Sequence, residues 1–221
     1  MSEFKNNLKI IKKWLKSNQP DYYSELQDGF DREELEDYLK PVPFLLPSEF
    51  YDLYQWHDGM TFDDDFFAAQ LFPGYTFNSL SVAFAIREEI SEWVDDILLY
   101  RIRYENEIWI EHSGILNNYL LPIFTLDEFD HICILGKSDR REASPLISIY
   151  IQDSIFLAYD SLATAIKTIA TCYQTGAYYN FELPDGEQEL RDDPQQAKEV
   201  WKRYNPQSYN ALLRQYGENG F

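Results

Sequence analysis

Residues 119–136 read YLLPIFTLDEFDHICILG. Two short runs of β-branched and aromatic residues, at 119–124 and 131–136, flank a polar segment, which is the pattern of two strands joined by a turn. Runs of the same kind recur at 98–104, 108–112, 146–152 and 154–159. Several strands in succession, separated by short polar stretches, predict a largely antiparallel central sheet.

Helices are predicted on both sides of this strand series. Phe4, Leu8, Ile11 and Leu15 recur at intervals of 4, 3 and 4, which places them on one face of an opening helix. We expect this face to dock on its own domain; the alternative is a helix that lies on a membrane surface. Similar signals predict helices at 32–40, 47–57 and 81–96, and between Ser161 and Gly176.

The chain after Pro184 has its own helix signals. Asp193-Pro194 and Pro206 are both typical helix starts, and Ala197, Val200, Trp201 and Tyr204 follow the first at helical spacing. Helices before and after a run of strands predict an α+β class. We therefore expect one α+β domain over residues 1–180, with a helical C-terminal extension, residues 181–221, packed on the same domain.

The charge of the chain is strongly negative. The formal net charge is −19, and residues 1–16 carry five lysines against one glutamate, which leaves −23 on the remaining residues. Such a field repels nucleic-acid phosphates and anionic membranes and attracts a basic macromolecule. We therefore expect a basic protein partner and no nucleic acid; the alternative is that the acidity serves only solubility.

The N-terminal segment and the cysteines bear on the compartment. Lys12, Lys13 and Lys16 interrupt every apolar run near the start, so neither a signal peptide nor a membrane span is expected. Cys133 and Cys172 are far apart in sequence and fit no metal-binding or redox motif, so both are expected to be reduced, buried thiols. These features predict a cytoplasmic protein.

Motifs that carry chemistry are missing from the sequence. It contains no nucleophile elbow, no P-loop and no dinucleotide fingerprint. His57, His112 and His131 are separated by whole predicted elements, and none belongs to a spacing that puts metal ligands on one helix face. We expect no catalytic residue, no metal and no cofactor, with a small hydrolase of dispersed site as the remote alternative.

Two acidic groups are candidates for binding a basic partner. Asp63, Asp64 and Asp65 are consecutive, which does not fit the alternating ligands of a calcium loop. They are interpreted either as a solvated loop or as a negative patch. Glu88 and Glu89, on the helix predicted at 81–96, would extend this patch if the helix faces the same way.

Residues 44–59 read FLLPSEFYDLYQWHDG and resemble the signature of the SUKH superfamily: a Leu-Pro pair, an aromatic-rich helix and an Asn-Gly turn. The matching residues are Leu46, Pro47, Phe50, Tyr51, Tyr54 and Gly59, while Asp58 replaces the usual asparagine. The resemblance extends in element order over roughly residues 3–178. It implies a sheet flanked by helices, no established catalytic residues and, in bacteria, neutralisation of a toxin domain, often a nuclease. The fungal branch, regulators of the Smi/Knr type, implies an intracellular scaffold instead.

Trp56, His57 and Asp58 close this segment and are further candidates for partner binding. Tryptophan is enriched among the residues that dominate binding energy at interfaces, so Trp56 is a candidate anchor. The alternative is structural: Trp56 packs in the core, and His57 and Asp58 fix the turn.

Overall fold

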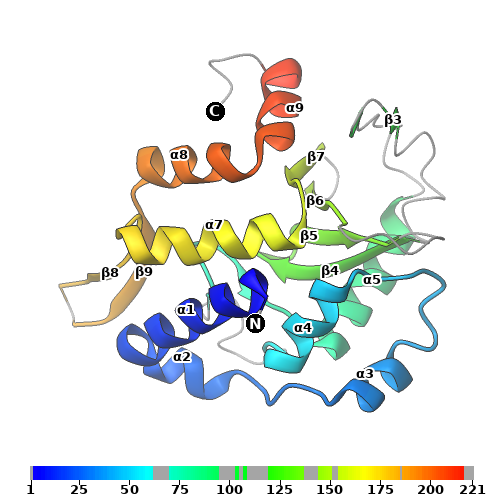
Figure 1. Ribbon diagram of the computed structural model, residues 1–221, viewed down its shortest axis with the longest axis horizontal. Coiled ribbons are helices and arrows are strands. Elements are labelled where there is room, and N and C mark those ends of the chain that lie inside the picture. The colour runs from blue at the N-terminus through cyan, green and yellow to red at the C-terminus, as the bar shows by residue number, and fades with distance from the viewer. Residues whose placement is uncertain are drawn as a thin grey trace.

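The computed structural model describes residues 2–61, 70–94, 103–104, 107–108, 119–136, 144–150, 154–184 and 186–216 (Figure 1). Its helices are α1 (Glu3–Asn18), α2 (Pro20–Glu25), α3 (Arg32–Tyr38), α4 (Ser48–Trp56), α5 (Leu80–Val94), α7 (Leu162–Thr175), α8 (Pro194–Tyr204) and α9 (Pro206–Tyr216). Its strands are β1 (Thr76–Phe77), β2 (Arg103–Tyr104), β3 (Glu107–Ile108), β4 (Leu120–Thr125), β5 (Asp130–Leu135), β6 (Leu146–Tyr150), β7 (Ser154–Tyr159), β8 (Tyr178–Glu182) and β9 (Gln188–Asp192). The α+β class is confirmed.

The main sheet has five strands in the order β1-β4-β5-β6-β7, and every neighbouring pair is antiparallel. β4 and β5 are joined by a turn in which the Asp127 carboxylate accepts the backbone N–H groups of Phe129 and Asp130. All six residues of β4 are buried. Because successive side chains point to opposite faces of a sheet, this burial means that both faces are covered at β4.

α1 docks on its own domain, as its apolar stripe predicted. Phe4, Leu8, Ile11 and Leu15 are all buried, and the helix packs against α7. Figure 1 shows α7 running across the molecule between α1 and α8, and both of these helices contact it. α7 begins at Ser161 with the predicted cap and ends at Gly176, whose φ is +77°.

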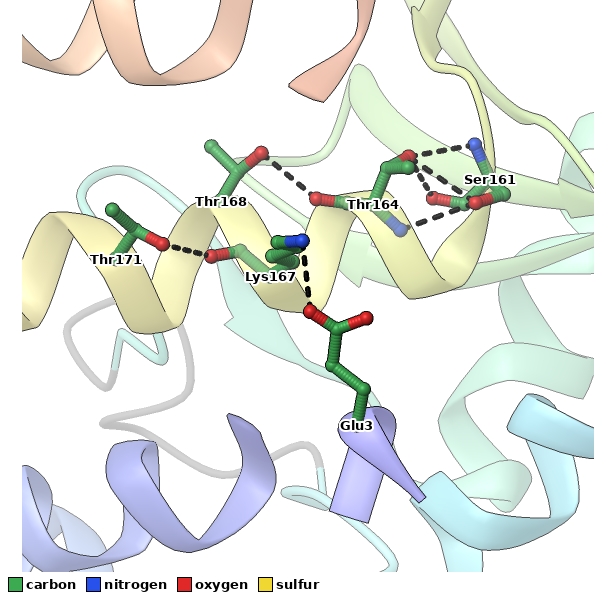
Figure 2. A network of polar contacts seen from close by, with 6 residues as sticks. All are labelled: Glu3, Ser161, Thr164, Lys167, Thr168 and Thr171. Carbon is green, nitrogen blue, oxygen red and sulfur yellow. Dashed lines mark hydrogen bonds and ion pairs between the residues drawn. The ribbon is translucent and has the colours of Figure 1, made fainter. Parts of the chain in front are cut away.

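An ion pair joins α1 to α7 near the start of the chain. Figure 2 shows Lys167 Nζ pointing to the Glu3 carboxylate, which lies 2.8 Å away. Lys167 lies one turn along α7 from Thr164, which exchanges hydrogen bonds with the N-cap residue Ser161. The same ammonium lies 4.7 Å from the centre of the Tyr204 ring on α8. Lys167 therefore contacts both helices that flank α7, although the ion pair adds little stability because Glu3 is exposed to solvent.

The C-terminal part contains both predicted helices and one element that the sequence did not predict. α8 and α9 begin at Pro194 and Pro206, and α9 packs against β7. Between α7 and α8 lies the β8–β9 hairpin, so the boundary expected at residues 180 and 181 falls inside β8. No helix among the described residues combines the length and apolarity needed to span a bilayer.

Candidate partner-binding site

The aromatic helix of the 44–59 segment is α4. Pro47 is its N-cap residue, one position before the first helical turn in which the sequence placed it. Phe50, Leu53 and Tyr54 are fully buried, and the Tyr54 hydroxyl donates to the carbonyl of Asn78 at 3.1 Å. α4 is therefore packed with its aromatic face inward, against the segment that connects β1 to α5.

Gly59, at the end of the 44–59 segment, lies very close to the backbone of Asn78. Its φ is +70°, and a Cβ at this position would lie 2.5 Å from both the carbonyl carbon and the oxygen of Asn78. The next residue, Met60, donates its N–H to the Phe77 carbonyl at 2.8 Å. Only glycine fits both the left-handed conformation and the space. The turn after α4 is thus held against β1 by the Met60 hydrogen bond.

Asp58 does more than fix the turn. Its side chain is 8% exposed, and its Oδ1 accepts the backbone N–H of Leu80, the first residue of α5, at 2.8 Å. Burial raises the pKa of this carboxyl to about 6, and the Leu80 bond opposes that shift. An asparagine carbonyl would offer the same acceptor, so either residue type can serve here.

His57 is buried against α2 and the segment that follows it. Nδ1 lies 2.9 Å from the Gln27 carbonyl oxygen and Nε2 lies 3.1 Å from the Tyr23 hydroxyl. Burial lowers the pKa of His57, and the charges of Lys12 and Lys16 lower it further. Since a carbonyl can only accept, the neutral imidazole donates from Nδ1 and accepts the Tyr23 hydroxyl proton at Nε2.

Trp56 lies beside these two residues on the same corner. Its ring stacks at 19° to Phe77 and meets His57 edge to face, with the ring centres 4.7 Å apart. Its indole nitrogen is buried. Trp56 contacts His57, while the side chains of His57 and Asp58 bond to Tyr23, Gln27 and Leu80. For His57 and Asp58 these contacts favour a structural role over partner binding. Asp63, Asp64 and Asp65 lie outside the described residues.

Glu88 and Glu89 are exposed on α5, whose Ile86 and Ile90 are buried. One turn before Glu88, the ring of Phe84 stacks on Tyr38 at the end of α3, with ring centres 5.7 Å apart. Tyr38 remains 39% exposed. The contact places the acidic helix α3 next to the exposed side of α5.

We call the exposed residues around this contact the acidic α3–α5 surface. It consists of Glu33, Glu34, Glu36, Asp37, Tyr38, Glu88 and Glu89. Some of these carboxylates form ion pairs with nearby basic residues: Glu36 pairs with Arg32, and Asp37 pairs with Lys40 at 2.7 Å. The α3 residues were not among the candidates predicted from the sequence, although the run REELEDY is visibly acidic. No sequence pattern near Tyr38 or Phe84 indicates that their rings come into contact.

The histidines do not form a metal site in the described part of the chain. No group of three His, Cys, Asp or Glu side chains suitable for a metal ion occurs there. His131 is 3% exposed, its Nδ1 lies 3.1 Å from the Thr125 hydroxyl, and burial lowers its pKa to about 4. His112 lies outside the described residues.

Comparison with known proteins adds no further constraint. Scans against protein-family models and against curated proteins find no match to this chain.

Proposed function

We propose that the protein is a non-enzymatic immunity protein that binds and neutralises a basic toxin domain through the acidic α3–α5 surface. The observation that carries the proposal is the exposed Tyr38 ring, held on Phe84 and surrounded by exposed carboxylates on two helices. The SUKH resemblance of residues 44–59 and the net charge of −19 support it. A cytoplasmic site of action fits the two free, buried cysteines.

The surface combines the two components that a specific interface needs. Carboxylates attract a basic partner and raise its association rate. An exposed aromatic ring can anchor the complex, because the partner buries it on binding. His57 and Asp58 are only 7% and 8% exposed, so they are poorly placed to touch a partner. Their role in this proposal is indirect: Asp58 starts α5, the helix that presents Glu88 and Glu89.

The first test is genetic. If the adjacent coding region specifies a toxin, its expression is expected to kill cells unless this protein is produced with it. The purified pair should then form a complex without any catalytic turnover by this chain. Survival that depends on an enzymatic activity of this protein, or a neighbouring product that it neither binds nor neutralises, contradicts the proposal.

The second test locates the surface. Replacing Glu88 and Glu89 together by lysine should reduce the association rate with the toxin by about tenfold, because exposed charges act on encounter. The matched control replaces Asp21 and Glu25, exposed acids of α2, by lysine, which changes the net charge equally. Stopped-flow association rates measure both variants. Equal effects would mean that only total charge matters and that this surface is not the contact.

A further inference from the structure

The β8–β9 hairpin has one face on the domain and one face in solvent. Tyr178 and Leu190, which point inward, are buried, whereas Tyr179 and Phe181 are 38% and 39% exposed. Because side chains alternate along a strand, Tyr179 and Phe181 share the outer face. Asn180 donates to the Asn18 carbonyl at the end of α1, so the hairpin is anchored to the domain while this face stays open.

This face already holds one guanidinium. Arg191 lies opposite Tyr179 in the ladder, and its guanidinium carbon is 3.9 Å from the centre of the Phe181 ring. Glu189, opposite Phe181, pairs with the same guanidinium at 2.6 Å. The hairpin thus shows the geometry in which an aromatic ring and a carboxylate of neighbouring strands receive an arginine.

The charge around the hairpin favours further cations. Residues 182–193 contain six acidic residues and one arginine. Figure 1 shows the hairpin at the left margin of the molecule, beyond the ends of α7 and α8 and away from α3. A second copy of this chain, with its own net charge of −19, is a poor occupant for so acidic a surface.

We propose that the outer face of the β8–β9 hairpin, marked by Tyr179 and Phe181, is a docking surface for an extended, arginine-bearing segment of a protein partner. Arginines of that segment stack on the two exposed rings and pair with the hairpin carboxylates, as Arg191 does within the chain. Arginine is preferred over lysine because its planar guanidinium stacks on an aromatic face and binds carboxylates with two donors. The inference goes beyond the proposed function, since it concerns another surface and any partner with such a segment.

The test uses the full chain and a fluorescently labelled peptide of alternating arginine and serine. Fluorescence anisotropy at about 0.1 M salt measures its affinity. Tyr179→Ser combined with Phe181→Ser should weaken binding at least about tenfold, because both stacking surfaces are lost. The matched control is Tyr150→Ser, which removes a ring of 41% exposure at the end of β6 and should change the affinity less than about twofold.

Two further measurements distinguish docking from general attraction to an acidic protein. The same peptide with lysine for arginine should bind several-fold more weakly. Backbone amide NMR shifts on titration should concentrate in residues 178–192, and an unchanged spectrum elsewhere shows that the double variant is folded. Absent binding, equal loss in the Tyr150 variant, or shifts centred on α3 and α5 would overturn the inference. None of these results bears on the toxin tests, which use a different ligand and different variants.

Discussion

Asp58 and Asp160 are two buried aspartates, and each caps a helix that begins far along the chain. Asp58 accepts one donor, the N–H of Leu80 at the start of α5. Asp160 accepts three at the start of α9: the N–H groups of Gln207 and Ser208 and the Ser208 hydroxyl. Both side chains are less than a tenth exposed. A buried aspartate therefore caps a distant helix twice, once in the 44–59 segment and once at the C-terminal extension.

The two sites differ in what else holds them. At the α4 corner the backbone of Gly59 lies against Asn78, so close approach of the chain itself fixes the geometry. At the C-terminal site the contact consists of side-chain hydrogen bonds. The Asn205 side chain accepts the Asp160 N–H and donates to the Thr168 hydroxyl. The Trp201 indole N–H donates to the Ala158 carbonyl. A backbone-fixed corner is expected to tolerate side-chain changes at its aspartate better than a side-chain network does.

The largest effect is expected at Gly59. Gly59→Ala should lower the free energy of unfolding by roughly 4 kcal/mol, because the methyl group meets the Asn78 backbone and φ is positive. Gly176→Ala is the control: its φ is +77°, but nothing lies within 4 Å of a Cβ there, so only the conformational cost of about 1 kcal/mol remains. Denaturant unfolding measures both. Equal losses would show that the corner is not fixed by contact.

An intermediate effect is expected at Asp160. Asp160→Ala leaves two buried N–H groups and a hydroxyl without their acceptor, which should cost roughly 3 kcal/mol. The loss should be local to α9, so hydrogen exchange should speed up in residues 206–216 while α5 amides keep their protection. Uniform loss of protection across both helices would mean that the extension and the domain unfold as one unit.

The smallest effect is expected at Asp58, where Asp58→Asn keeps the acceptor for Leu80. The pKa of Asp58 in the folded protein, about 6, exceeds the ordinary aspartate value of 3.8. The wild-type stability contributed by this group is therefore full below the lower value and is lost as pH rises through about 6. The asparagine variant does not titrate. Its stability relative to wild type should therefore rise by roughly 1 to 2 kcal/mol between about pH 4 and about pH 8. A difference that stays constant with pH would show that Asp58 is not buried as a titrating carboxyl.

Elements with strong local signals could be predicted from the sequence. The spacing of Phe4, Leu8, Ile11 and Leu15 identified α1, and Ser161 with Gly176 marked both ends of α7. Pro194 and Pro206 marked the starts of the last two helices. In each case the deciding residues lie within a few turns of one another, so no knowledge of tertiary contacts was needed.

Features that depend on distant partners could not be predicted. β8 reads YYNFE, which has no strict alternation of apolar and polar residues, and its pairing with β9 depends on contacts that form only in the hairpin. The sequence around Asp58 indicated only a turn residue. Its role as the cap of α5 could not be predicted, because Leu80, whose N–H it accepts, lies beyond β1. Of the predicted site residues, Glu88 and Glu89 are exposed, as a binding role requires. The position of α3 beside them could not be predicted, because it depends on the contact between the rings of Tyr38 and Phe84.

The packing of α1 on α7 has a consequence for synthesis of the chain. α1 is made before α7, the helix that packs on its apolar face and begins at residue 162. Until then the face of α1 that packs on α7 stays uncovered, although α2 and α4 already contact this lysine-rich helix. Such exposed apolar surface makes the nascent chain a substrate for factors that hold unfinished proteins. Contacts between such distant segments also slow folding, because a long loop must close first. The burial of α1 is thus complete only after α7 has been made.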